Sequence, residues 1–265
     1  MKSSSAPGWL RRMAEIASRG VILQRRLPAR FGGTPLYVSP ECGLRYWRRD
    51  MRKVDPVLLQ MVDRYVSAGD VVWDVGANVG LCGFAAAHRA SQVLLIEPDP
   101  WLARLLERSA KSYSNVSVVR AGVADYCGTG ILHIAARARA SNFIQGKGST
   151  QTGGERRTEE VRVVTLDSLA PPLPDVLKID VEGAEPAVLR GATRILGERR
   201  PKLICEVSWQ NVAEVTALLR DYSLFDGESG KPVSVATWNT VAIPRARSEK
   251  IQMPVPAQEL IGCKD

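Results

Sequence analysis

Hydrophobic residues alternate between two spacings along the chain, and this alternation predicts a mostly parallel sheet covered by helices. Short apolar runs typical of buried strands are separated by stretches in which apolar residues recur every three or four positions. The predicted strands cover residues 71–75, 93–96, 116–119, 131–135, 161–166, 176–179, 202–207, 224–225 and 240–243. The predicted helices cover residues 55–66, 81–90, 101–111, 186–196 and 212–220. Strands and helices that alternate in this way favour an α/β fold with helices on both faces of the sheet.

The N-terminal part of the chain has a different pattern and most of the positive charge. Apolar residues recur at helical spacing over residues 9–23 with arginines between them, which predicts an amphipathic basic helix. We expect this helix either to dock on the core or to lie on an anionic membrane surface. Residues 1–53 contain 12 Lys or Arg and 3 Asp or Glu, whereas the remainder contains 24 and 25. A near-neutral remainder argues against a nucleic-acid enzyme, whose positive charge usually follows the substrate channel.

The composition is that of an ordinary globular protein, with 45% hydrophobic and 24% charged residues. We expect neither a membrane-spanning helix, which needs a run of about 18 apolar residues, nor a secretory signal. The cysteines are scattered and odd in number, which favours reduced thiols in the cytoplasm over a disulfide framework or a zinc site. They are Cys42, Cys82, Cys127, Cys205 and Cys263.

A glycine-containing turn between a predicted strand and a predicted helix is the strongest local signal. Residues 74–80 have the spacing Asp-x-Gly-x-x-x-Gly, not the Gly-x-Gly-x-x-Gly that seats a dinucleotide pyrophosphate. S-adenosylmethionine has no phosphate, and its ammonium group favours a nearby carboxylate, which Asp74 can supply directly or through water. The alternative is a purely structural turn. The cofactor-binding residues predicted here are Asp74, Gly76, Ala77, Asn78 and Gly80.

Two further carboxylates follow predicted strands and complete the expected cofactor site. Glu97, which precedes Pro98, ends the second strand, where an acidic residue can accept hydrogen bonds from both ribose hydroxyls. Asp125 follows the third strand, where a carboxylate can accept a hydrogen bond from an adenine amino group. An Asx-turn before Gly128 is an equally good explanation of Asp125. We include Glu97, Pro98 and Asp125 in the cofactor site.

Charged residues at the end of the fourth strand predict the catalytic centre. Strand alternation puts Lys178, Asp180 and Glu182 on one face, directed toward the same strand ends as the glycine turn. A buried ion pair between Lys178 and a carboxylate is the structural alternative. We expect Asp180 to act as general base, with Glu182 or Glu206 orienting the acceptor or sharing the proton. Spacing alone leaves open whether these carboxylates hold a divalent metal.

Three weaker candidates for site residues lie before, within and after the predicted strand at residues 131–135. His88 is expected to pack within its helix, and His133 to lie at the surface. Ser141 and Asn142 are in a position to contact acceptor or cofactor. Residues 146–160 are rich in Gly, Thr and charge, which predicts a mobile loop.

The motifs together resemble the FkbM-type methyltransferases, within class I. The blocks that carry this resemblance are residues 72–80, 97–98, 165–169 and 177–185, extended by 188–192. The resemblance implies a Rossmann-like sheet with a reversed last strand and S-adenosylmethionine as methyl donor. It also implies O-methylation of a hydroxyl on a sugar, a glycan or a secondary metabolite. We therefore divide the chain into a basic extension (1–54), a methyltransferase domain (55–245) and a C-terminal tail (246–265).

Other functions share parts of this pattern. A nicotinamide oxidoreductase has the same strand–helix–strand beginning but a different glycine spacing. An amino-directed DNA methyltransferase would be expected to have Asp/Asn-Pro-Pro-aromatic after the fourth strand, where this chain has residues 180–183 as Asp-Val-Glu-Gly. N-methylation and a membrane-associated, non-catalytic cofactor-binding protein are the remaining alternatives. The sequence does not predict the oligomeric state.

Overall fold

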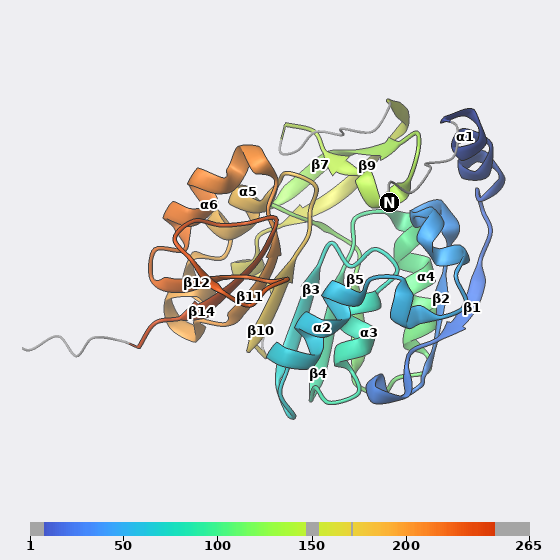
Figure 1. The fold of residues 1–265 in the computed structure, drawn as a ribbon. Helices are drawn as coiled ribbons and strands as arrows, with labels where there is room; N and C mark the ends of the chain where they lie inside the picture. The colour runs from blue at the N-terminus through green and yellow to red at the C-terminus, as the bar shows by residue number, and fades with distance from the viewer. Residues whose placement is uncertain (1–7, 147–153, 171, 247–265) are drawn as a thin grey trace, which may run out of the picture.

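The computed structural model describes residues 8–146, 154–170 and 172–246, and its centre is a sheet of eight strands (Figure 1). The order across the sheet is β13-β12-β14-β11-β10-β3-β4-β5. Pairing is parallel from β11 to β5, and β14 runs antiparallel between β11 and β12. This arrangement confirms the predicted α/β fold with a reversed last strand. The strands are β3 (Val71–Val75), β4 (Gln92–Ile96), β5 (Val116–Val119), β10 (Val176–Ile179), β11 (Lys202–Glu206), β12 (Tyr222–Asp226), β13 (Pro232–Val233) and β14 (Asn239–Pro244).

Helices cover both faces of the sheet, as the alternating pattern predicts. On one face α2 (Pro56–Tyr65), α3 (Leu81–Ala86) and α4 (Pro100–Ala110) share a buried apolar cluster. On the other face α5 (Glu185–Arg190) and α6 (Val212–Leu218) share a second cluster. Asp55 caps α2 and Asp99 caps α4, each carboxylate accepting backbone N–H groups of the first turn, and a proline follows each cap. The capping residues therefore fix where these helices begin.

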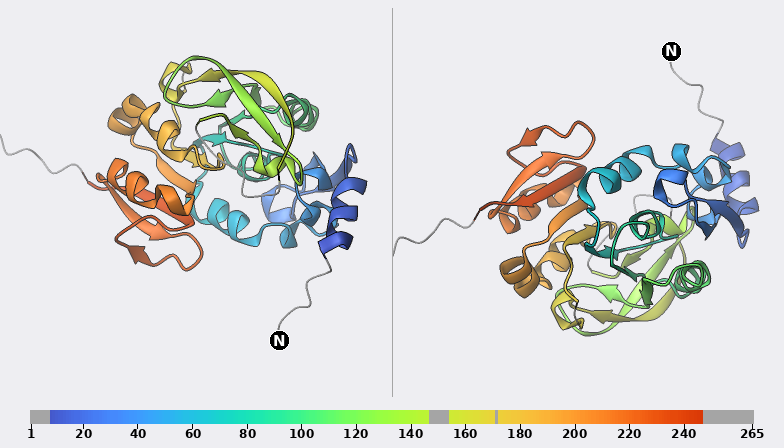
Figure 2. Two further views of the ribbon diagram at one scale, coloured as in Figure 1. Left: turned by 90° about the horizontal axis from the view of Figure 1, so that it is seen from above. Right: turned by 90° about the horizontal axis from the view of Figure 1, so that it is seen from below.

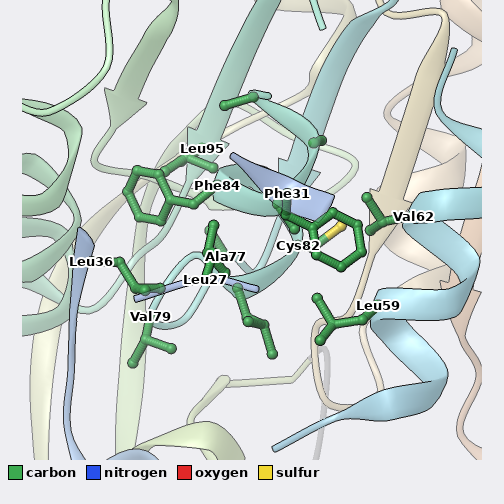
Figure 3. Close-up of a cluster of buried hydrophobic side chains, with 14 of the residues drawn as sticks. Leu27, Phe31, Leu36, Leu59, Val62, Ala77, Val79, Cys82, Phe84 and Leu95 are labelled. Carbon is green, nitrogen blue, oxygen red and sulfur yellow. The ribbon is translucent and has the colours of Figure 1, made fainter. Parts of the chain in front are cut away.

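Residues 23–54 form an additional layer on the first helical face. A hairpin of β1 (Leu23–Arg26) and β2 (Pro35–Val38) packs beside α4, where the backbone N–H of Tyr37 donates to Ser109 Oγ at 2.8 Å. Leu27, Phe31 and Leu36 join the cluster that contains side chains of α2 and α3 (Figure 3). By contrast, α1 (Gly8–Ala17) has no buried side chain. Figure 2 shows the N-terminal layer and the C-terminal strands at opposite ends of the molecule.

A second, smaller sheet lies at the end of the central sheet where β5 finishes. Its strands are β6 (Gly122–Val123), β7 (Gly128–Ala135), β8 (Phe143–Ile144) and β9 (Glu155–Val164), in the order β6-β9-β7-β8. We call these four strands the cap sheet. It packs against α5 through a third apolar cluster and lies above the central strands in Figure 1.

The cap sheet corrects the prediction of a mobile loop over residues 146–160. Residues 155–160 belong to β9 and pair with β7 in antiparallel register, for example Glu160 with Ile131. The polar composition of residues 155–160 suggested a loop. The side chains of this half of β9 are mostly exposed, however, and exposed strand positions accept polar residues. Residues 147–153 of the predicted loop lie outside the described residues, as do the tail residues 1–7 and 247–265.

The predicted helix over residues 186–196 is also wrong in its second half. The first part, α5, ends at Arg190, and residues 195–199 form a π-helical turn. A Cβ at Gly191 would overlap the carbonyl oxygen of Ala124, so the chain passes very close to that backbone. The carboxylate of Asp167 then accepts the N–H groups of Arg194 and Ile195, at 2.7 and 3.0 Å, and starts a new turn. A long-range contact therefore interrupts what the periodicity presents as one helix.

Candidate active site

A cavity of about 390 Å³ lies where the carboxyl ends of the central strands meet the cap sheet. Parallel strands place the residues that follow them at one edge, and ligands of open α/β sheets bind there. The cavity wall contains seven of the residues predicted from sequence. They are Gly76, Asn78, Glu97, Pro98, Asp180, Glu182 and Glu206.

The cavity has two chemically different halves. The cofactor half contains the glycine turn, the residues after β4 and an apolar wall. Its members include Gly76, Asn78, Ile96, Glu97, Pro98, Leu102, Val123, Arg139, Asn142, Phe143 and Ile144. The acceptor half contains mainly charged and polar groups. Its members include Arg45, Asp55, Asp180, Glu182, Glu206, Trp238 and Asn239, with Val57, Val181 and Ala184 beside them.

The turn after β3 brings main chain and cavity into close contact. Gly76 has φ +71°, and a Cβ there would overlap the carbonyl oxygen of Asp180, so only glycine fits. Asn78 has φ +54°, a conformation that asparagine tolerates better than most residues. Its Oδ1 is buried and accepts no hydrogen bond within the described chain. This oxygen therefore needs a donor from a ligand or from water.

Glu97 is the centre of the cofactor half. Its Oε2 accepts the backbone N–H of Asn78 at 2.8 Å, and its Oε1 accepts that of Asp99 at 3.0 Å. A carboxyl group has more hydrogen-bonding positions than these two N–H groups occupy, so capacity remains for further partners. Burial raises the pKa of Glu97 to about 8. The side chain is thus held rigidly where the sequence analysis placed the ribose acceptor.

Asp74 lies beneath the glycine turn and does not form part of the cavity wall. It is fully buried, its Oδ2 accepts the N–H of Gly83 at 2.9 Å, and its Oδ1 lies 3.1 Å from Lys178 Nζ. Lys178 also contacts Asp180 Oδ2 at 3.4 Å and donates to the carbonyl oxygen of Gly76 at 2.9 Å. Burial alone would lower the pKa of Lys178, but the carboxylates of Asp74 and Asp180 raise it above its usual value. The buried ion pair, stated above as the structural alternative for Lys178, is therefore present.

Three other predicted cofactor residues also lie away from the cavity wall. Ala77 is buried in the core, and Gly80 begins α3 with φ +79° against the ring of Phe84. Asp125 forms an ion pair with Arg190 at 3.1 Å. At β6 the chain leaves the central sheet and enters the cap sheet, so Asp125, which follows β6, lies away from the cavity wall. Its contact with adenine stays a prediction.

The three predicted catalytic carboxylates meet in the acceptor half. Asp180 directly follows β10, and Glu206 ends β11 beside it. Glu182 has φ +51°, a conformation that costs a residue with a Cβ roughly 1–2 kcal/mol. Such strain often accompanies functional positions. Burial, together with the Asp180 carboxylate, raises the pKa of both Glu182 and Glu206 to about 8.

Sequence reasoning missed the residues that reach the cavity from distant parts of the chain. Arg45 lies in the N-terminal layer and forms an ion pair with the α2 cap Asp55 at 2.9 Å. Trp238 and Asn239 lie at the beginning of β14, on the other side of the acceptor half. Nothing in the local sequence marks these four residues. Asn142, which the sequence did single out, lines the cofactor half, and His133 does not line the cavity.

Arg139 joins the N-terminal layer to the cofactor half through a buried ion network. Its guanidinium donates to Glu41 at 2.8 Å and to Asp99 at 2.5 Å and stacks over the Trp101 ring at 4.7 Å. Asn142 donates to the same Asp99 carboxylate at 2.8 Å. Since Asp99 N–H binds Glu97, the network supports the expected ribose acceptor. Residues far outside the glycine turn therefore help to hold the cofactor half in shape.

The described residues contain no group of three or more His, Cys, Asp or Glu side chains arranged to hold a metal ion. No helix within the same ranges is both long and apolar enough to cross a bilayer. 

Strand order, reversed strand and a cavity at the strand ends define a Rossmann-like fold of the class I methyltransferase type. The family model described as the methyltransferase FkbM domain matches residues 74–224, which is more than half of the chain. The chain therefore belongs to the FkbM methyltransferase domain family.

Individual proteins similar to this chain include one curated enzyme and several solved structures. The hexuronic acid methyltransferase AglP of Haloferax volcanii is 31% identical over 156 residues, 57% of this chain. The match spans 61% of that enzyme's length. A crystal structure of methyltransferase FkbM from Methylobacillus flagellatus is 20% identical, with a TM-score of 0.43 over 66% of this chain and 43% of that one. The tRNA methyltransferase TrmK of B. subtilis is 17% identical, with a TM-score of 0.43 over 71% and 65% of the two chains.

Proposed function

We propose that this protein is an S-adenosylmethionine-dependent methyltransferase that methylates a hydroxyl oxygen, most naturally on a sugar. The observation that carries the proposal is the single cavity in which the cofactor half faces three adjacent carboxylates of the acceptor half. Family membership supports the donor, and the curated relative's name supports a sugar acceptor. A glycan or secondary-metabolite hydroxyl fits the same chemistry.

The cofactor half fits S-adenosylmethionine. Glu97 retains acceptor positions for ribose hydroxyls, and the buried Asn78 Oδ1 needs a donor. The neighbouring apolar side chains, among them Val123 and Phe143, provide a wall suited to the flat adenine. The ion pair of Asp74 with Lys178 keeps the turn in the conformation that these contacts require.

Positioning provides most of the acceleration in the proposed reaction. Bound S-adenosylmethionine supplies a methyl group on sulfur, which moves to the acceptor oxygen as the carbon–sulfur bond breaks and the carbon–oxygen bond forms. Asp180 accepts the proton that leaves the hydroxyl, and a positioned base contributes about 10²–10⁴-fold. Glu182 and Glu206 orient the acceptor beside Asp180.

Calorimetry with S-adenosylmethionine and with NAD tests the donor, and mass spectrometry of a sugar panel incubated with S-adenosylmethionine tests the transfer. We expect binding of the first cofactor alone and a mass increase of one methyl group on a sugar. Binding of NAD alone would contradict the proposal. Activity that survives a chelator would show that no exchangeable metal takes part.

We also propose that residues 9–23 contact an anionic membrane surface. The helix α1 leaves Trp9, Met13 and Ile16 exposed, and it contacts the segment after β7 through the Glu15–Arg137 ion pair. Docking of the apolar stripe on the core, the alternative raised by the sequence, is not what the structure shows. An amphipathic helix with exposed apolar side chains and arginines binds anionic lipid, each cation adding about 1 kcal/mol.

Sedimentation with phosphatidylglycerol vesicles tests the membrane contact. We expect salt-sensitive binding that the double variant Trp9→Ser, Met13→Ser abolishes. The matched control is Trp209→Ser, which removes a Trp that is 71% exposed elsewhere on the surface. Equal binding to phosphatidylcholine vesicles, or no binding at all, would refute this contact.

A further inference from the structure

The acceptor half contains more acidic than basic side chains. Each cation near it already has a carboxylate partner, because Arg45 pairs with Asp55 at 2.9 Å. Lys178 lies between Asp74 and Asp180, at 3.1 and 3.4 Å. Glu182 and Glu206 have no cationic partner at ion-pair distance within the described ranges. A ligand that enters this half therefore meets two carboxyl groups with unused hydrogen-bonding capacity and no spare positive charge.

Glu182 and Glu206 have the hydrogen-bonding character that a polyol needs. Burial and the Asp180 carboxylate raise the pKa of each to about 8, so both hold a proton near neutral pH. A protonated carboxyl group donates one hydrogen bond and accepts others, as a sugar hydroxyl does. Asn239, opposite Glu206 in the β11–β14 register, adds an amide whose nitrogen donates to Glu228 at 3.2 Å and whose oxygen can accept.

Trp238 provides an apolar surface beside these polar groups. The backbone N–H of Val207 donates to the Trp238 carbonyl oxygen at 2.8 Å, which holds the residue next to the end of β11. The Trp238 side chain lines the cavity yet is 54% exposed. A large exposed aromatic ring in a binding cavity offers a flat contact area with little conformational freedom to lose. The C–H face of a pyranose ring matches such a surface.

We propose that the acceptor is a sugar ring without a carboxylate, held by Glu182 and Glu206 with its apolar face on Trp238, and that the site rejects uronic acids. This inference rests on the proposed function and narrows its substrate class. A carboxylate brought into this half would find no free cation and would lie beside the Asp180 carboxylate, and like charges that meet in a binding site are disfavoured. The preference would differ from that named for the curated relative, a hexuronic acid methyltransferase.

Matched pairs of ligands test the charge preference directly. The probes are methyl glucoside with methyl glucuronide and methyl galactoside with methyl galacturonide, titrated at pH 7 by ligand-observed NMR in the presence of S-adenosylhomocysteine. We expect each neutral glycoside to bind at least about tenfold more tightly than its uronide, the consequence of an unpaired charge. Equal or tighter binding of the uronides would overturn the proposal. Failure of all four to bind would also overturn it.

Two variants show whether the named side chains cause the preference. Asp55→Asn takes the charged partner from Arg45 and keeps a residue that can cap α2, so it should reduce the penalty against the uronides at least about threefold. Glu198→Gln, on an exposed turn, should leave the penalty unchanged. Trp238→Ala should weaken the neutral glycosides about fivefold, and Trp209→Ala should not. An unchanged penalty in Asp55→Asn or unchanged affinity in Trp238→Ala would refute these assignments. Calorimetry with S-adenosylmethionine tests the methyl donor without any sugar present. A failure of the sugar proposal can therefore be told apart from a failure of the proposed methyl donor.

Discussion

The two halves of the cavity are assembled in different ways. The cofactor half takes its polar centre from short segments directly after β3 and β4, at residues 76–78 and 97–98. The acceptor half takes residues from Arg45 to Asn239, nearly the whole described length of the chain. Residues 45, 55, 238 and 239 also lie outside the 74–224 match to the family model. Local turns thus form the proposed donor site, whereas distant segments come together at the proposed acceptor site.

The largest effect is expected where the cofactor half depends on a buried ion network. Arg139→Met leaves Glu41 and Asp99 without this guanidinium, and breaking a buried pair costs about 3–5 kcal/mol of unfolding free energy. Urea denaturation measures the loss. The matched control, Arg137→Met, breaks a more exposed pair with Glu15 and should cost at most about 1 kcal/mol. Equal losses in the two variants would show that the network does not stabilise this half.

Asp180→Asn should separate the acceptor half from the cofactor half. The amide keeps the shape of the side chain but cannot accept the hydroxyl proton, so turnover should fall at least about 100-fold. Calorimetry should show nearly normal affinity for S-adenosylmethionine. If affinity collapses while turnover stays near that of the wild type, Asp180 belongs to the cofactor half.

Glu97→Gln tests the cofactor half alone. The amide replaces one of the two carboxyl oxygens by an NH₂ group, which cannot accept a hydrogen bond, so affinity for S-adenosylmethionine should fall by about 0.5–1.5 kcal/mol. Asp125→Asn provides the comparison, because Asp125 lies off the cavity wall and pairs with Arg190. Its affinity should stay within about threefold of the wild type. A larger loss in Asp125→Asn would restore its predicted contact with adenine.

The last expected effect is a pH dependence contributed by Glu206, which its partial exposure to solvent reduces. Its pKa rises from 4.5 to about 8 because of burial, so between these values the folded protein binds more protons than the unfolded chain. The contribution of Glu206 to stability is complete below pH 4.5 and is lost as the pH rises toward 8. Calorimetric melting should therefore show a shallower decline across this interval in Glu206→Gln than in the wild type. Parallel profiles would contradict the raised pKa.

The sequence predicts the central sheet well because each strand carries its own signal. The strand predicted at residues 71–75 coincides with β3, and the capped, proline-initiated helices begin within a residue or two of their predicted positions. The prediction failed at β9 and after Gly191. In both places a partner far along the chain, β7 or the Ala124 backbone, decides the local conformation, and periodicity contains no information about that partner.

The difference between local signals and long-range partners also explains which site residues could be predicted. Glu97, Asn78 and Asp180 follow strands whose ends must meet, so their convergence in one cavity could be predicted from the order of elements. Arg45 and Trp238 reach the cavity through the packing of the N-terminal layer and the insertion of β14. Asp74 follows the spacing of the glycine turn, so its sequence position suggested contact with the cofactor. Its pairing with Lys178 beneath the turn depends on the register of β3 with β10, which the local sequence does not contain.

Lys178 has a consequence for how this enzyme can change in evolution. One ammonium group contacts Asp74, Asp180 and the Gly76 carbonyl, so it belongs to the donor turn and to the proposed base at once. Residues that share a buried partner do not contribute additively. Substitutions at positions 74 and 178 are therefore epistatic, because either single step leaves a buried charge without its partner. A change at position 180 leaves the Asp74–Lys178 pair in place and alters only the surroundings of Lys178.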